Sequence, residues 1–94
     1  MKIEWVRSAW IDLEEAVNFI SQDNPEAARK MARRILQAAR LLAEHPGAGR
    51  VGRVPGTREL VIVGTPFILP YRVKDNTVQI LRVLHGSRKW PPAL

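Results

Sequence analysis

The sequence predicts an α+β domain in which a helical hairpin covers one face of an antiparallel sheet, in the order β-α-α-β-β-β. Three observations support this prediction. Apolar residues recur at helical spacing up to about residue 44, the segments after residue 57 are rich in Val, Ile, Leu and Tyr, and a Gly- and Pro-rich loop at 46–57 separates the two halves. A chain of 94 residues holds one hydrophobic core. We therefore expect a single domain over 1–94.

The first two predicted elements are a short strand and an acidic helix. Ile3 and Trp5 alternate with charged neighbours, which is typical of a strand with one buried face. Ser8 is the expected N-cap of the helix. The apolar stripe of this helix has spacings of 3, 4 and 3, and its members are Trp10, Leu13, Val17 and Ile20. Trp5 on the buried face of the strand and Trp10 on this stripe are both expected to be core residues.

A second helix is predicted from Pro25 to about Glu44. Asn24 is the expected N-cap, Pro25 suits the first helical position, and the carboxylate of Glu26 suits the positive end of the helix dipole. The many small residues in its seam allow close approach to the first helix, so the pair predicts an antiparallel hairpin. The expected seam is Ala28, Ala32, Ile35, Ala39 and Leu42, with Met31 at its margin.

Three strands are predicted after the loop, at 57–63, 67–74 and 77–85. The short turns between them indicate an antiparallel meander. Pro70 falls inside the middle strand, and because proline has no N–H to donate, it predicts a bulge or an unpaired position there. A polar, Pro-rich tail follows at 86–94.

The net charge of +6 is distributed unevenly along the chain. Residues 1–28 contain two basic and six acidic side chains, a net charge of −4, whereas residues 29–94 contain thirteen basic and three acidic ones, a net charge of +10. Eleven of the fifteen cations are arginine, which suits contacts with phosphate or carboxylate. The basic half is consistent with a nucleic-acid surface, an acidic protein partner, or a solvated face without a partner.

The candidate site lies on the sheet face that the helices leave uncovered. We expect its side chains to converge there as a cationic groove; they are Arg58, Arg72, Arg82, His85, Arg88 and Lys89, with Trp90 at the edge. The structural alternative is that Arg58 and Arg72 pair with Glu59 and Asp75 and that His85 is an ordinary strand-end residue. For Trp90, stacking on a base or packing under a partner peptide stands beside docking of the tail on the core, which we favour.

Other kinds of site have little support. The chain has no cysteine and only two histidines, neither with a ligand partner at metal-binding spacing, so no metal site is expected. The G-x-G-x-x-G match at 47–52 follows a helix and precedes a strand, the reverse of a dinucleotide fingerprint, and no cofactor is expected. The longest apolar runs are far too short to span a bilayer. A cytoplasmic protein without membrane contact is the expectation.

Several motifs resemble the ParE/RelE superfamily of bacterial type II toxins, also called plasmid stabilisation proteins. The similar segments cover nearly the whole chain: WIDLEEAVNFI at 10–20, NPEAA at 24–28, PGAGRVGRVPGTREL at 46–60, LPYRV at 69–73 and ILRVLHGSRKWP at 80–91. GTREL, YRV and LRVLHGSRKW are the most specific, and they are similar to the ParE branch in particular. The resemblance implies a toxin that binds a cognate antitoxin in a hetero-oligomeric complex.

Two activities are implied by the superfamily. RelE-like members cleave messenger RNA on the ribosome with a cluster of basic side chains, whereas ParE-like members poison DNA gyrase without acting as ordinary enzymes. Alignment on LPYRV places RelE-like basic positions at Glu59, Val61 and Ile68, and a late tyrosine near Leu94, so only Arg88 is retained.

The resemblance therefore favours a growth-inhibiting gyrase poison without catalytic residues, in which Arg58, Arg72, Arg82, His85, Arg88 and Trp90 meet the target or the antitoxin. The alternatives are an endoribonuclease that uses Arg58, His85 and Arg88, and a non-toxic relative that only binds an antitoxin.

Overall fold

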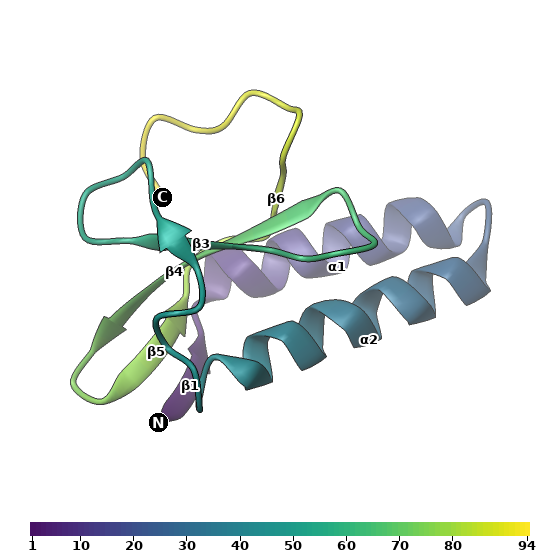
Figure 1. The fold of residues 1–94 in the computed structure, drawn as a ribbon. Coiled ribbons are helices and arrows are strands. Elements are labelled where there is room, and N and C mark those ends of the chain that lie inside the picture. The colour runs from purple at the N-terminus through teal and green to yellow at the C-terminus, as the bar shows by residue number, and fades with distance from the viewer.

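The two helices lie side by side on one face of a six-stranded sheet in the computed structural model, which describes residues 1–94 (Figure 1). The strand order is β1-β5-β4-β3-β2, and β6 continues beside β4. The observed order of elements confirms the predicted α+β fold with its helical hairpin and meander. The elements are β1 Lys2–Trp5, α1 Arg7–Ser21, α2 Pro25–Leu41, β2 Arg50–Val51, β3 Arg58–Val61, β4 Phe67–Lys74, β5 Thr77–Ile80 and β6 Leu84–His85.

The two helix starts differ in how they are capped. Asn24 caps α2 as predicted, because its side-chain oxygen accepts from the N–H of Ala27 at 3.1 Å. The predicted cap at Ser8 is wrong: α1 already begins at Arg7, with Val6 at the N-cap and no side-chain cap. The reason is that the N–H of Val6 still donates to the carbonyl of Ile80 at 3.1 Å, so the chain passes directly from β1 into α1.

The end of α2 comes three residues earlier than predicted. After Leu41 the N–H groups of residues 42–44 bond three residues back rather than four, which tightens the chain into turns before Pro46. The buried seam of α2 is close to the prediction, but Met31 is buried and Ala32 is only half-buried. Neither helix combines the length and the hydropathy needed to cross a membrane.

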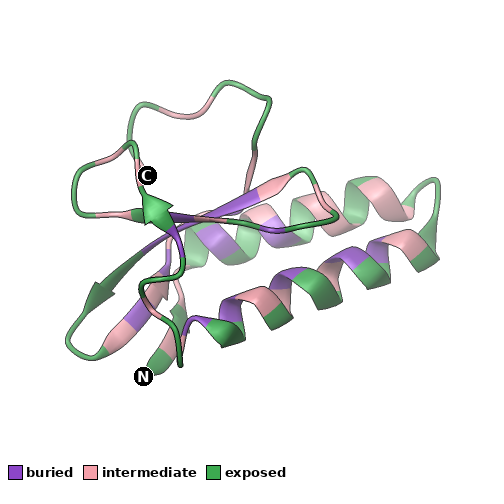
Figure 2. Cartoon of the chain, viewed as in Figure 1, coloured by how far each residue is buried: buried purple, intermediate pink, exposed green.

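The core lies between the hairpin and the sheet (Figure 2). Ala9 and Leu13 are the buried residues of α1, and Ile35, Leu69 and Ile80 are fully enclosed. These side chains face one another between the helices and the sheet. Burial of their apolar surface is therefore the main contribution to the stability of the fold.

The prediction that Trp10 belongs to this core is wrong. The side chain of Trp10 is 48% exposed and stacks on Trp5, with ring centroids 4.8 Å apart. Trp5 is half-buried and packs against the core from β1. The small residue Ala9 takes the inward position instead, so the two indole rings close the edge of the core.

The strand β1 pairs with β5 in parallel, which places the N-terminal strand at one edge of the sheet. The other adjacent pairs are antiparallel. The turn between β4 and β5 consists of Asp75 and Asn76, both with positive φ, 52° and 57°. Two such residues form the tight turn whose twist matches a β-hairpin, and aspartate and asparagine tolerate this conformation.

The bulge predicted from Pro70 lies in the strand that faces it. Tyr71 pairs with Ile80 and Ile68 pairs with Leu84, so Leu69 and Pro70 face a longer segment of three residues, 81–83. The carbonyl of Pro70 accepts from the N–H of Leu81 at 2.9 Å, but the ring offers no donor in return. This missing donor divides the predicted strand 77–85 into β5 and β6.

Tyr71 fastens the loop 46–57 to the sheet. Its ring is fully buried, its hydroxyl donates to the carbonyl of Pro46 at 2.8 Å, and the N–H of Gly49 donates to the hydroxyl oxygen at 2.9 Å. A Cβ at Gly49 would stand 2.7 Å from this hydroxyl and 2.8 Å from the carbonyl oxygen of Glu59, so only glycine fits.

We expect Tyr71→Phe to lower the free energy of unfolding by about 1–3 kcal/mol, because it leaves two buried backbone groups without a partner. Urea unfolding monitored by circular dichroism measures this loss. The hydroxyl would have no such role if the variant unfolded at the same urea concentration as the parent protein.

Candidate functional site

The sheet has one face packed against the helices and one open face. Cross-strand partners share a face, so Arg58, Leu69 and Tyr71 point toward the helix side, whereas Glu59 and Arg72 point toward the open side. The predicted site residues are therefore divided between two faces.

Glu59 lies on the open face next to the loop. Its side chain is only 3% exposed, and one carboxylate oxygen accepts from the guanidinium of Arg50 at 3.1 and 3.3 Å. The other oxygen accepts from the backbone N–H of Arg53 at 2.8 Å and from its guanidinium at 3.2 Å. One carboxylate thus holds the two arginines of the loop 46–57.

These contacts determine the ionisation of Glu59. Burial by itself raises the pKa of this carboxyl, but hydrogen bonds from the Arg53 backbone and from the guanidinium groups of Arg50 and Arg53 outweigh burial. The pKa of Glu59 is therefore lower than its ordinary value, and the charged form is the stable one.

Arg53 also connects the loop to the C-terminal tail. Its guanidinium carbon lies 3.5 Å from the centroid of the Trp90 ring, a cation–π contact, and the indole N–H of Trp90 donates to the carbonyl of His85 at 3.1 Å. Trp90 is half-buried. These contacts confirm the prediction that Trp90 docks the tail on the domain.

Arg82 lies on the helix side of the bulge, bound to α1. Its guanidinium donates to both carboxylate oxygens of Asp12, at 2.7 and 3.1 Å, and the N–H of Val83 donates to the same carboxylate at 3.0 Å. The hydrogen bonds to Asp12 raise the pKa of Arg82 above its ordinary value, against the opposing effect of burial. This ion pair anchors the bulge to the helical layer.

Arg58 and Arg72 are on opposite faces of the sheet. Arg58 donates to the carbonyl of Gly49 at 2.8 Å, and Arg72 donates to the side chain of Gln79. The expected ion pairs of these arginines with Glu59 and Asp75 do not form. The expected convergence of all the basic residues on the open face is also wrong, because strand alternation and the bulge send Arg58, Arg82 and His85 to the helix side.

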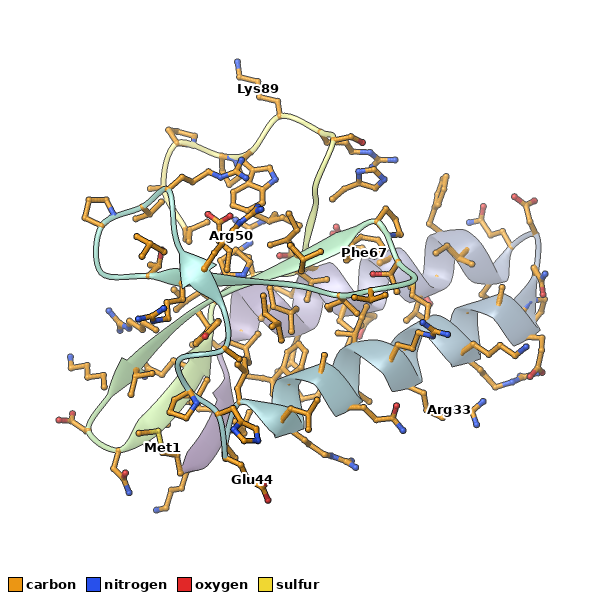
Figure 3. The ribbon with its side chains drawn as sticks, in the orientation of Figure 1. Met1, Arg33, Glu44, Arg50, Phe67 and Lys89 are labelled. Carbon is orange, nitrogen blue, oxygen red and sulfur yellow. The ribbon has the colours of Figure 1, made fainter.

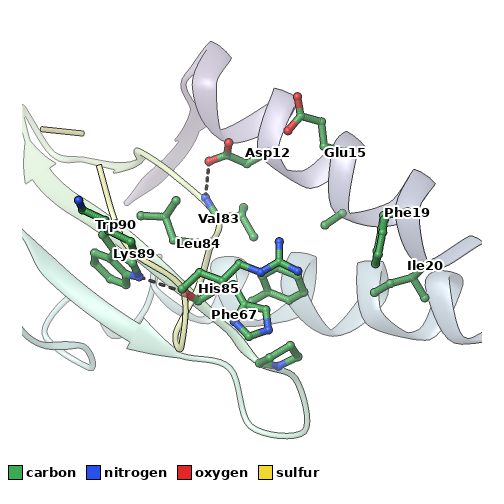
Figure 4. A pocket seen from close by; sticks show the side chains of 13 residues that line it. Asp12, Glu15, Phe19, Ile20, Phe67, Val83, Leu84, His85, Lys89 and Trp90 are labelled. Atoms are coloured by element: carbon green, nitrogen blue, oxygen red, sulfur yellow. Dashed lines mark hydrogen bonds between the residues drawn. The ribbon is translucent and has the colours of Figure 1, made fainter. Parts of the chain in front are cut away.

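Four of the predicted residues do come together, in a pocket of about 490 Å³ between α1 and the tail (Figure 4); they are His85, Arg88, Lys89 and Trp90. We call it the tail pocket. Its walls include Phe19 and Ile20 of α1, Phe67 of β4, and His85, Arg88 and Trp90 at the end of the chain.

His85 is held in the tail pocket by two neighbours. Its ring meets Phe67 edge to face, with centroids 5.7 Å apart, and its Nδ1 accepts from the N–H of Ser87 at 3.2 Å. Because Nδ1 is the acceptor of this bond, the proton of the neutral ring lies on Nε2. Lys89 also lines the tail pocket, and its side chain extends from the tail into solvent (Figure 3).

Sequence analysis missed Arg50 and Arg53 as members of the site. Both belong to the loop whose glycines drew attention, and Glu59 is the one acid between Glu44 and Asp75 in that basic half. An isolated acid close in sequence to two loop arginines is the signal from which this cluster could have been predicted. No group of three or more His, Asp and Glu side chains is arranged to hold a metal ion.

The fold is the α+β arrangement of small toxins that the motifs predicted, and comparisons with known proteins agree. Residues 3–90 match the family model described as the ParE toxin of the type II toxin–antitoxin system parDE. The chain is 42% identical over 93 residues to the protein Y4kP of Sinorhizobium fredii, covering 99% of this chain and 96% of that protein. It is 39% identical over 87 residues to the toxin RelE2 of Caulobacter vibrioides, covering 93% and 97%.

A solved structure of the chromosomal ParDE toxin–antitoxin system from P. aeruginosa superposes with a TM-score of 0.81 at 36% identity, covering 88% of this chain and 92% of that one. The chain belongs to the ParE toxin family of type II toxin–antitoxin systems. This confirms the resemblance to the ParE/RelE superfamily.

We expect Glu59→Gln to destabilise the protein by about 1–3 kcal/mol at pH 7, because it replaces charge-assisted hydrogen bonds by neutral ones. The folded-state pKa of Glu59 is depressed, so its contribution is present above the unfolded pKa of about 4.3 and is lost as pH falls toward the folded value. The stability difference between parent and variant should therefore shrink in acid.

Urea unfolding at a series of pH values tests this dependence, with Glu44→Gln as the matched control because Glu44 is exposed and forms no ion pair. A difference that stays constant from neutral to acidic pH would contradict the role of the Glu59 carboxylate.

Proposed function

We propose that this toxin inhibits growth by poisoning DNA gyrase without catalysing a reaction, and that a cognate antitoxin neutralises it by binding. The observation that carries the choice of target is the placement of Glu59 on the open sheet face, where it binds Arg50 and Arg53. Membership of the ParE family supports the same choice.

Cleavage of RNA through the ribose 2′-hydroxyl needs an acid, a base and cations for the phosphate at one place. On the open face the cations nearest the loop, Arg50 and Arg53, are engaged by the Glu59 carboxylate. The Glu59 carboxylate competes with a phosphate for the hydrogen-bond donors of both arginines. The open face is therefore poorly suited to stabilise the transition state of RNA cleavage.

The one histidine of the candidate site lies on the other side of the sheet. His85 pairs with Phe67 in the register of β6 and β4, so its ring shares the helix side with Phe67, whereas Arg72 points to the open face. An acid–base group and the Arg72 cation of the open face are thus separated by the sheet. This separation favours a binding function over an endoribonuclease.

The groove between α2 and β3 supports the proposed binding of an antitoxin. Its volume is about 390 Å³ and its lining is mainly apolar. Leu41, Val61 and Val63 line it and are 60%, 47% and 83% exposed. Exposed apolar residues gathered in one groove mark an interaction surface.

The edge of β3 adds a backbone site beside this groove. The two-residue strand β2 pairs only with Arg58 and Glu59, so Val61 has an open edge. Arg34 of α2 donates to the carbonyl of Val63 at 3.0 Å and places a cation at the rim. An antitoxin segment with apolar and acidic residues would complement both features by adding along this edge.

We expect the purified toxin to make gyrase accumulate cleaved DNA. Arg88→Glu should weaken this effect by about tenfold, which corresponds to about 1.4 kcal/mol of lost interaction. The reason is that Arg88 has no ion partner within the chain and is available for a contact with the target. Arg58→Glu should also weaken the effect. Arg33→Glu is the matched control, since Arg33 is an exposed arginine on the outer side of α2.

Circular dichroism of each variant separates loss of contact from loss of folding. Gyrase that is unaffected by the parent toxin would refute the proposed target, and ribosome-dependent cuts in a messenger would establish the endoribonuclease instead. Normal growth on expression without the antitoxin would refute both toxic activities and leave an antitoxin-binding relative.

For the antitoxin groove, Val63→Asp should lower the affinity for the cognate antitoxin by about tenfold or more, because it places a charge in an apolar contact. Val51→Asp is the matched control: Val51 is 81% exposed on β2 and lies outside the groove. Calorimetric titration of each variant with the antitoxin measures the difference. Equal affinities for the two variants would place the antitoxin elsewhere.

A further inference from the structure

Phe19 stands beside the tail pocket, and the antitoxin groove uses neither of them, although Arg88 on the pocket wall also belongs to the proposed gyrase contact. Phe19 is 66% exposed, more than any other aromatic residue of the chain, and it stands at the wall of the tail pocket on α1. A large exposed aromatic side chain beside an apolar cavity marks a protein contact.

The cavity accepts a side chain of this kind. Ile20, Phe67 and Leu84 contribute apolar surface, and the volume of about 490 Å³ exceeds that of one phenyl ring. Phe19 does not fill the pocket itself, because its ring remains mostly in solvent. The chain therefore carries a protruding aromatic group and a cavity of matching chemistry on one surface.

Charged side chains of both signs also border the tail pocket. Glu15 of α1 is on one wall, and Arg88 and Lys89 of the tail are on the opposite wall. None of these three forms an ion pair within the chain, whereas Asp12 is neutralised by Arg82. The free acid and the free bases thus lie on either side of the apolar cavity.

We propose that this surface is an interface between two copies of the chain, in which Phe19 of each copy enters the tail pocket of the other. A two-fold contact requires a patch that is complementary to itself. In such a dimer Glu15 of one copy would lie opposite Arg88 and Lys89 of the other, and this contact would occur twice. The dimer also buries both exposed phenylalanines.

A second copy fits the charges of the patch better than a peptide of one charge sign. A purely acidic segment would meet Glu15, and a purely basic one would meet Arg88 and Lys89. A second copy supplies an aromatic group, an acid and two bases. The antitoxin groove between α2 and β3 has no residue in common with the tail pocket, so the dimer does not depend on the proposed antitoxin contact.

Sedimentation equilibrium of the purified chain, from micromolar to submillimolar concentration and at low and high salt, tests the proposal. We expect a monomer–dimer equilibrium that salt weakens by screening the charge pairs. Phe19→Asp and Glu15→Lys should each weaken the dimer by about tenfold or more, because every dimer contains two copies of each substitution.

A charge exchange makes the test specific. Arg88→Glu alone should weaken the dimer, and combining it with Glu15→Lys should restore most of the affinity, because the pair is then reversed rather than removed. The matched control is Glu14→Lys, since Glu14 is an exposed acid next to Glu15 but does not line the pocket. Circular dichroism verifies that all variants are folded.

A chain that remains monomeric at every concentration and salt would overturn the proposal. So would a dimer that persists in Phe19→Asp, a loss of affinity with Glu14→Lys equal to that with Glu15→Lys, or a charge-exchange variant without restored affinity. Because this assay contains neither gyrase nor antitoxin, its outcome is independent of the target of the toxin.

Discussion

The carboxylate of Glu59 is the contact on which the irregular parts of this structure depend. The loop 46–57 has almost no regular secondary structure, and β2 within it has only two residues. Glu59 holds both loop arginines, and Arg53 in turn holds Trp90 and with it the tail. The wall of the tail pocket that contains Arg88 and Trp90 is therefore set by an acid on the far side of the loop.

Tyr71 and Glu59 bind the loop from opposite faces of the sheet. Tyr71 bonds Pro46 and Gly49 from the helix side, while Glu59 bonds Arg50 and Arg53 from the open side. A loop this rich in glycine loses much conformational entropy when it becomes ordered. Anchors on both sides offset this loss and keep the loop arginines in fixed positions.

The sequence predicted the features that depend on neighbouring residues, including the two helices, the cap at Asn24, and the turn at Asp75 and Asn76. It also predicted a disturbance at Pro70, but placed it in the middle strand rather than in the strand that faces it. It did not predict the long-range pairs. Asp12 and Arg82 are seventy positions apart, and no periodicity states which acid each arginine meets. The burial of Trp10 was predicted wrongly for the same reason. The long-range pairing of β1 with β5 places Trp5 at the edge of the core, where Trp10 stacks on it.

The folded protein distributes charge differently from the sequence. The acidic first helix and the basic remainder are joined by one ion pair, Asp12 with Arg82, while Glu59 takes up two loop arginines. The cations without an ion partner include four of α2 and both of the tail. The tail pocket lies where the acidic helix meets the basic tail, so both signs of charge border one apolar cavity, a distribution that makes the surface complementary to itself.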